Sequence, residues 1–289
     1  MLPKDIQGLL LAFLSVFVFS WTLPASKMAV GELGGWGLGL SRSLLAGSLA
    51  LLVLLIRQVP FPARTHWKSL VVVALSAVGF AVSVAMAMRD VPSIHAAVVI
   101  AVIPVATSLI AVARMRERPT WRFWIGLAAG SSTVVLFLTT QTGTGMHIHQ
   151  ADLWLIASLL CSAITYVEGG KLASSMPGWQ VISWMLVFTL PAILPMALYW
   201  WMHQPQPLHL GLQAWMAVLY VSVFSAYLGF FPWYHSFSLI GISRASSVQL
   251  LQPLLTFTWG ALFLGEHLTQ GILVAGFLVL GSSFLCWKR

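Results

Sequence analysis

The chain has 289 residues, of which 59% are hydrophobic and only 8% are charged. Soluble domains carry roughly a quarter charged residues, so a chain this poor in charge cannot cover a water-exposed surface, and we expect its solvent to be lipid. The formal net charge of +8 therefore indicates membrane topology rather than nucleic-acid binding. Cys161 and Cys286 lie far apart inside apolar runs and imply no disulfide framework.

Ten apolar runs follow one another along the chain, and each has the length that a helix needs to cross the hydrocarbon core. The first run is longer than the apolar core of a signal peptide, so we interpret it as a retained span. The predicted spans are 6–29, 36–56, 69–88, 93–113, 121–139, 152–170, 180–201, 212–238, 242–264 and 268–287. The predicted fold is therefore an all-α membrane protein with ten transmembrane helices.

Lysine and arginine are concentrated in alternate loops between these runs. If the N-terminus is inside, the inner segments contain Lys4, Arg57, Arg64, Lys68, Arg114, Arg116, Arg118, Lys171, Arg244, Lys288 and Arg289. The outer loops at 141–150 and 203–211 contain neither Lys nor Arg. This positive-inside pattern predicts that both termini are cytoplasmic. The compact size of the chain favours the bacterial inner (plasma) membrane.

The sequence contains an internal repeat, because 240–269 aligns without a gap with 91–120 at an offset of 149 residues. The identical pairs are Ala245 and Ala96, Val248 and Val99, Pro253 and Pro104, Thr256 and Thr107, Glu266 and Glu117, and Thr269 and Thr120. We therefore predict two five-span repeats, at 1–140 and 151–289. Since five is odd, the second repeat enters the membrane with opposite polarity. Such an inverted repeat favours alternating access around a site near the midplane.

The two copies read PVATSLIAVARMRERPT and PLLTFTWGALFLGEHLT. A span with a proline, ending in Glu with Thr shortly after, resembles the EamA-type transporters of the drug/metabolite transporter superfamily. Trp21, Lys27 and Arg42 in the first two spans are also similar to that family. The resemblance implies an exporter of amino acids, toxic cations, metallophores or other metabolites. The first copy departs from the pattern, because Arg114-Met115-Arg116 replaces the usual Leu-Gly before Glu117.

Glu168, in the sixth span, is the ionisable residue that stands out, because a carboxylate at membrane depth is costly and indicates a functional site. One interpretation is recognition of a substrate amine or proton coupling. The other is a partly hydrated ion pair with Lys171 near the inner end of the helix. Tyr166, two residues earlier, is included among the candidate substrate-binding residues.

Span nine carries four polar side chains on one helical face, namely Gln249, Gln252, Thr256 and the Trp259 indole. They could line a central cavity or join helices by hydrogen bonds. We favour the cavity, because Pro253 frees a backbone carbonyl between them. Pro104, Pro253, Glu117 and Glu266 are predicted to be structural or hinge residues.

His95 and Arg244 occupy equivalent places at the starts of spans four and nine, where either could attract a substrate carboxylate, although Arg244 also fits a positive-inside anchor. An aromatic-rich set could stack on a flat or cationic substrate: Trp21, Phe80, Tyr227, Trp233, Tyr234 and His235. Trp21 and Tyr234 are the preferred members, since most other aromatic residues are expected to face lipid. Lys27 and Arg42 are expected near the outer surface with Glu32, snorkelling or guarding the exit.

No catalytic or metal site is expected. His147, His149 and Asp152 lie in a loop without a fixed fourth ligand, and the sequence shows no phosphate-binding glycine loop, metalloprotease motif or nucleophile elbow. We therefore predict neither an enzyme nor a cofactor, and transport driven by a gradient or exchange rather than by ATP. The expected partners are a small-molecule substrate and the lipid bilayer, with the proton as a candidate coupling ion and a monomer or homodimer as the assembly.

The leading functional hypothesis is an exporter of small amphipathic metabolites, above all an amino acid or amino-acid derivative. A metallophore exporter is the first alternative and an exporter of aromatic or toxic cations the second. An intramembrane enzyme would need a nucleophile–base pair or a metal cluster, and a non-transporting scaffold would have a tightly packed midplane.

Overall fold

The computed structural model describes residues 3–91, 96, 101–142, 150–203, 210–264 and 270–287, and all regular structure within these ranges is helical. In chain order the helices are α1 (Lys4–Ser20), α2 (Thr22–Ile56), α3 (Arg64–Asp90), α5 (Ile103–Met115), α6 (Trp121–Thr142), α7 (Gln150–Ala173), α8 (Gly178–Met202), α9 (Leu212–Leu219), the π-helix η1 (Tyr220–Leu228), α10 (Phe230–Ile240), α11 (Ile242–Ser246), the 3-10 helix η2 (Ser247–Leu251), α12 (Gln252–Leu264) and α13 (Gln270–Trp287).

Five helical stretches are long and apolar enough to cross a membrane: Lys4–Ile56, Arg64–Asp90, Gln150–Ala173, Gly178–Met202 and Leu212–Ile240. Two shorter apolar helices, Ile103–Met115 and Phe277–Trp287, accompany them. The structure thus has the all-helical character that the composition predicted. The count of ten spans stays a prediction, because parts of the fourth and tenth predicted spans lie outside the described residues.

The first stretch is interrupted twice. α1 gives way to α2 at Trp21, three residues before Pro24, which has no amide hydrogen to donate to the carbonyl of Ser20. Within α2, Gly34 adopts φ +66° and ψ 173°, a conformation outside the helical region that glycine tolerates. An unbroken helix of 35 residues would be about 52 Å long, far more than the roughly 30 Å of a bilayer core. The break at Gly34 divides it between the predicted spans 6–29 and 36–56 and lets the chain reverse direction there.

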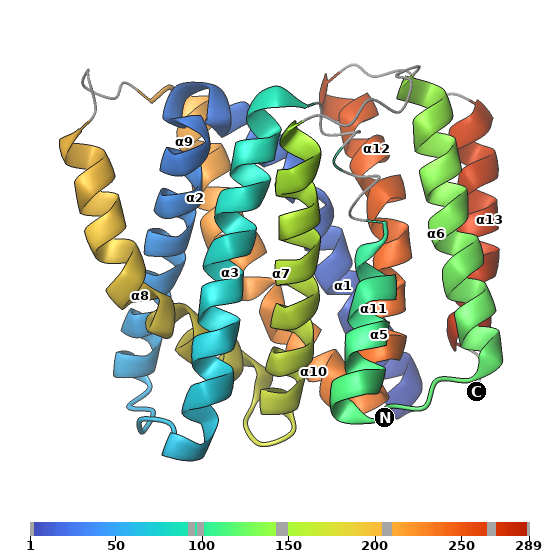
Figure 1. Cartoon of the computed structure of the whole chain (residues 1–289), viewed down its shortest axis with the longest axis horizontal. Coiled ribbons are helices and arrows are strands. Elements are labelled where there is room, and N and C mark those ends of the chain that lie inside the picture. The colour runs from blue at the N-terminus through green and yellow to red at the C-terminus, as the bar shows by residue number, and fades with distance from the viewer. Residues whose placement is uncertain are drawn as a thin grey trace.

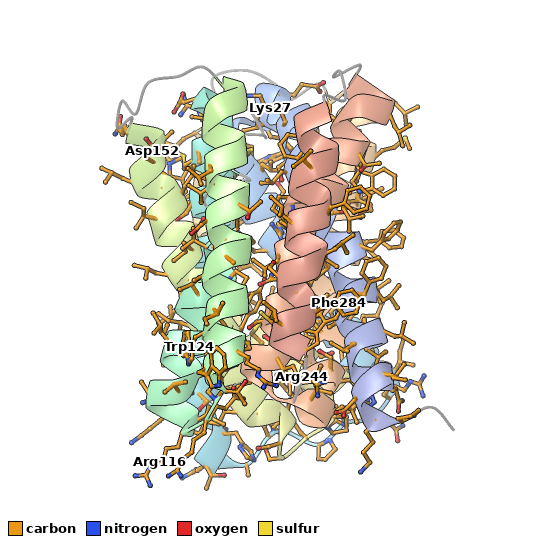
Figure 2. The ribbon with its side chains drawn as sticks, turned by 90° about the vertical axis from the view of Figure 1, so that its right-hand side faces the viewer. Lys27, Arg116, Trp124, Asp152, Arg244 and Phe284 are labelled. Carbon is orange, nitrogen blue, oxygen red and sulfur yellow. The ribbon has the colours of Figure 1, made fainter. Side chains whose placement is uncertain are left out.

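The helices run side by side, and both ends of the described chain lie at the same end of the bundle (Figure 1). α3 packs against α2 and α7, α8 against α2, and α1 against α10. Figure 2 shows Arg116 and Arg244 near that end, and Lys27 and Asp152 near the opposite one. We call the end with Arg114, Arg116 and Arg244 the arginine end and the opposite one the Lys27 end.

α6 and α13 form a pair at one edge of the bundle (Figure 1). Gly126 and Gly130, one turn apart on α6, allow the close approach, since a Cβ atom added at Gly126 would lie 2.6 Å from the carbonyl oxygen of Ser282. Small residues spaced four apart are a common means of bringing membrane helices together.

The two repeat prolines begin helices. Pro104 lies in the first turn of α5, and Pro253 is the second residue of α12, directly after the 3-10 turn η2. Proline is favourable there because the first helical amides need no partner within the helix. The predicted span 242–264 is thus divided into α11, η2 and α12, while a hinge role for the prolines stays a prediction.

Candidate functional site

Two adjoining chambers lie between the helices, and Arg42, Phe80, Tyr166 and Phe230 line both of them. The apolar chamber is lined further by Ser43, Ala77, Val78, Ala81, Ser162, Thr165, Met185, Leu186, Thr189 and Ala226. The amide chamber is lined further by Phe19, Thr22, Leu23, Ile103, Ser225, Gln249 and Gln252. Residues from both predicted repeats therefore meet at one polar and aromatic site.

The site is narrow in this conformation. The centre of a water molecule can reach only about 40 Å³ of the apolar chamber and about 30 Å³ of the amide chamber. A bound water needs about 10–15 Å³ on this measure, so each chamber admits a few water molecules. A ligand the size of an amino acid would have to widen the chambers.

Among the described residues, Arg42 is the only charged one that lines these chambers. Its side chain is only 6% exposed. One guanidinium nitrogen donates a 3.4 Å hydrogen bond to Ser225 Oγ, and the guanidinium carbon lies 5.3 Å from the centre of the Phe80 ring. Within the described parts of the chain, Arg42 forms no ion pair. A charged side chain deep in a membrane costs about 2.5–3.5 kcal/mol on insertion scales, so a buried arginine that forms no ion pair among the described residues is a candidate functional residue.

The depth of Arg42 corrects the expectation that it lies near the outer surface with Lys27 and Glu32. Arg42 follows the break at Gly34 by eight residues, which corresponds to about 12 Å of helix. Its partner Ser225 belongs to the π-helix η1 and shares a 2.7 Å hydrogen bond with Thr22. π-helical turns often mark functional sites, and nothing in the sequence pattern signals this one.

Tyr166, Gln249 and Gln252 form the polar wall of the amide chamber. Gln249 Nε2 donates to Tyr166 Oη over 3.0 Å, and Gln252 Nε2 donates over 3.5 Å to the backbone oxygen of Phe19. The side-chain oxygen of each glutamine is buried and has no hydrogen-bond partner within the ranges that the structure describes. Both oxygens are therefore available to a ligand that carries hydrogen-bond donors.

The other two polar residues of span nine join helices. Thr256 Oγ1 donates over 2.8 Å to the carbonyl oxygen of Ser20, the group that Pro24 leaves without its helical partner. Trp259 Nε1 donates over 2.7 Å to Ser20 Oγ. Of the four residues expected to line a cavity, two do so, and the other two secure the junction between α1 and α2.

Glu168 lines neither chamber. Its side chain is 5% exposed and forms an ion pair of 2.5 Å with Arg114, whose side chain is 58% exposed. The partner is thus an arginine from α5 and not Lys171. The second carboxylate oxygen of Glu168 is buried, and no described residue forms a hydrogen bond with it.

The predicted aromatic residues are dispersed. Phe80 lines both chambers. Tyr234 is fully buried against Gly169 and donates over 3.3 Å to the Thr165 carbonyl, whereas His235 is exposed on α10. Trp21 packs edge-on against Trp259 at a centroid distance of 5.8 Å. None of these last three residues lines the two chambers.

Tyr227 and Trp233 are buried as well. Tyr227 shares a 2.8 Å hydrogen bond with Ser183, and Trp233 packs against Phe19, Tyr166 and Phe237. Both belong to the packing around the chambers rather than to their lining.

Two charged candidates tie helices together at the arginine end. Arg244 donates over 2.9 Å to Asp5 and over 2.5 Å to the Trp287 carbonyl, an anchoring role. Glu117 accepts hydrogen bonds from the backbone amides of Ile242 and Ser243, at the start of α11.

At the Lys27 end, Lys27 donates to the carbonyls of Met88 and Val91 beside the end of α3, over 2.8 and 3.1 Å. Glu32 accepts a 2.7 Å hydrogen bond from the amide of Gly211, before α9. His95, Glu266, His147 and His149 lie outside the described residues. Among the residues that the structure covers, no group of three or more His, Cys, Asp or Glu is placed to hold a metal ion.

The arrangement defines a class of protein. Long apolar helices surround two narrow chambers. The guanidinium group of Arg42 and the side-chain amides of Gln249 and Gln252 line the amide chamber. Such an arrangement suits reversible binding of a small molecule inside a membrane. The comparison with known proteins agrees. A family described as the EamA-like transporter family matches residues 6–139 and again 149–287, so the chain belongs to the EamA-like transporter family. It is therefore a membrane transporter and not an enzyme.

Relatives support the same assignment. The chain is 35% identical over 278 residues to a protein of Bacillus subtilis (strain 168) named "Uncharacterized transporter YdeK", and the match covers 96% of each protein. A solved structure titled "Crystal structure of protein" superimposes with a TM-score of 0.76 at 17% identity, and it covers 96% of this chain and 95% of that one. At this identity the second likeness concerns the fold alone.

Proposed function

We propose that this transporter exports an amino acid or an amino-acid derivative by alternating access around the two chambers. The observation that carries the proposal is that Arg42 lines the amide chamber together with Gln249 and Gln252, whose side-chain oxygens have no partner among the described residues. A guanidinium group binds a carboxylate through paired, charge-assisted hydrogen bonds. The amide oxygens accept hydrogen bonds from an ammonium group.

The two chambers suit the two parts of such a molecule. The amide chamber offers Thr22, Ser225 and the glutamines to a zwitterionic head group. The apolar chamber offers Ala77, Ala81 and Leu186 to an uncharged side chain. Arg42 lies at the border of both. A carboxylate bound there would neutralise the buried charge, so binding stabilises the protein in a way that an uncharged ligand cannot.

The alternatives fare differently. A metallophore that combines carboxylates with amines could use the same guanidinium group, so it stays the second candidate. An exporter of toxic cations receives less support, because the charge that lines the chambers is positive and Glu168 is engaged by Arg114. A scaffold without a transport site does not account for an unpaired buried arginine.

The orientation and the energetics belong to the same proposal. The arginine end carries the basic residues that the positive-inside rule assigns to the cytoplasm, and both chain ends lie there (Figure 1). We therefore place both termini in the cytoplasm of a cell with this protein in its inner membrane. The two repeats are taken as inverted copies that exchange conformations, with a proton gradient as the candidate driving force.

Counterflow in proteoliposomes tests the proposal. Vesicles that contain the purified protein and a high internal concentration of one compound are diluted into a trace of the same radiolabelled compound. The panel comprises amino acids with apolar side chains, the matching decarboxylated amines and deaminated acids, a metallophore, and an aromatic quaternary cation. We expect counterflow for amino acids and none for amines that lack the carboxylate. Counterflow of the cation alone would overturn the proposal, and counterflow of the metallophore alone would replace it with the second candidate.

A further inference from the structure

Helices α5 and α7 pack against each other and lead from the chambers to the arginine end. Ile103, the first residue of α5, lines the amide chamber, and Thr165 of α7 lines the apolar chamber. The ion pair between Arg114 and Glu168 lies near the last residue of α5 and one turn beyond Thr165 on α7. The interface between α5 and α7 therefore separates the ligand site from the surface at the arginine end.

Because Arg114 contacts Glu168, the face of α5 that carries Arg114 lies toward α7. Ile103, Thr107, Ala111 and Arg114 follow one another at spacings of three or four residues, so they share one face of α5. Thr107 and Ala111 are fully buried. On α7, Thr165 and Glu168 are three residues apart and also share a face. We call these two faces, from Ile103 to Arg114 and from Thr165 to Glu168, the α5–α7 seam.

The closed seam leaves polar atoms unsatisfied. The hydroxyl oxygens of Thr107 and Thr165 and one carboxylate oxygen of Glu168 are buried, and the described part of the chain gives them no hydrogen-bond partner. A buried polar atom that lacks a partner costs free energy, and water that enters an opened seam would recover it. Closure here is therefore opposed by hydration of the seam and must be held by specific contacts.

We propose that the α5–α7 seam is the gate between the chambers and the arginine end, and that the Arg114–Glu168 ion pair is its latch. This inference rests on the proposed transport function, because a gate has a role only in a protein that moves its ligand. Arg114 can leave easily, since its side chain is already 58% exposed. Glu168, which is buried, would then be hydrated by the water that fills the opening.

A neighbouring contact defines which parts move together. Glu117, three residues after Arg114, binds the backbone at the start of α11. The end of α5 therefore moves with α11 as one unit, and the break occurs between this unit and α7.

The reactivity of a cysteine in the seam tests the gate directly. Cys161 and Cys286, the two cysteines of the chain, are replaced by serine, and Thr107→Cys is introduced. The rate of modification by a charged maleimide is measured on the protein in nanodiscs without any transported compound. We expect slow labelling with the ion pair intact. Arg114→Gln or Glu168→Gln should accelerate it about tenfold, which corresponds to about 1.4 kcal/mol in the opening equilibrium.

Two further variants make the test specific. The exchange Arg114→Glu with Glu168→Arg restores an ion pair, so labelling should become slow again, which a misfolded protein would not show. Arg244→Gln removes the pair with Asp5, also at the arginine end but outside the seam, and should leave the rate unchanged. An unchanged rate in Arg114→Gln, or an equal acceleration in Arg244→Gln, would overturn the proposal.

The outcome is independent of the substrate, because labelling requires no transport. If the gate behaves as described but no amino acid shows counterflow, the substrate proposal fails and the gate stands. If amino acids are transported and the labelling rate is the same with and without the ion pair, the gate proposal is wrong and the substrate proposal stands.

Discussion

Replacing Glu117 by alanine tests how the two predicted repeats are joined at the arginine end. The carboxylate accepts hydrogen bonds of 2.7 and 2.9 Å from the amides of Ile242 and Ser243, and a third from the Ser243 hydroxyl. Gly241, with φ +83°, starts the turn that directs these amides toward the carboxylate. Without Glu117 the first amides of a five-residue helix have no partner.

The size of the effect follows from these contacts. A hydrogen bond to a charged group contributes about 1.5–3 kcal/mol, and loss of a helix cap costs about 0.5–2 kcal/mol. Because Glu117 is half-buried, water replaces part of the lost bonding, and we expect a net loss of about 2 kcal/mol. For a chain of this size that lowers the melting temperature by about 4 °C. Glu117→Gln keeps one acceptor oxygen and should lose about half as much.

Thermal unfolding of the detergent-purified protein, followed by the fluorescence of its tryptophans, measures this shift. Arg118→Ala is the matched control, because Arg118 is exposed and only one residue away, and it should melt like the unmodified protein. If Glu117→Ala melts at the same temperature as Arg118→Ala, the carboxylate does not hold α11 and the reasoning is wrong.

Two other substitutions test the packing. Gly126→Val places side-chain atoms against the Ser282 carbonyl, which a Cβ would approach to 2.6 Å, and should lower the melting temperature by several degrees. Gly281→Ala is the control, because no described atom lies within 4 Å of a Cβ at Gly281. Its melting temperature should be unchanged or slightly higher. Thr256→Val removes the hydroxyl that donates to the Ser20 carbonyl, which the proline in α2 leaves without its helical partner, and should cost about 1–3 kcal/mol. Thr258→Val, in an exposed position, is its control, and equal melting of the two threonine variants would contradict the assignment.

Much of the architecture could be predicted from composition and pattern, because lipid imposes long apolar helices and basic loops that are visible in one sequence. The family could be inferred from the repeated proline and glutamate. Tyr166, Gln249 and Gln252 were also selected as site residues, and they line the chambers. Their role in substrate binding stays a prediction.

The depth and the partners of the charged residues could not be predicted. Arg42 was expected near the outer surface, although the predicted second span, 36–56, begins close to the observed break at Gly34. Spacing within one span does not show which distant helix packs over a side chain. The partner of Arg42, Ser225, is 183 residues away and belongs to a π-helix. Lys171, in the same helix, was the partner considered for Glu168, whereas the observed partner is Arg114 of α5, 54 residues earlier in the chain.

The central claim is that Arg42 binds the carboxylate of the substrate, and a binding comparison tests it most directly. Isothermal titration of the purified protein with the best-transported amino acid and with its carboxamide derivative measures the preference for the charged group. We expect the unmodified protein to prefer the acid by at least about tenfold, or about 1.4 kcal/mol. Arg42→Gln should bind the acid and the amide equally. If Arg42→Gln keeps the full preference for the acid, the substrate carboxylate binds elsewhere and the account is wrong.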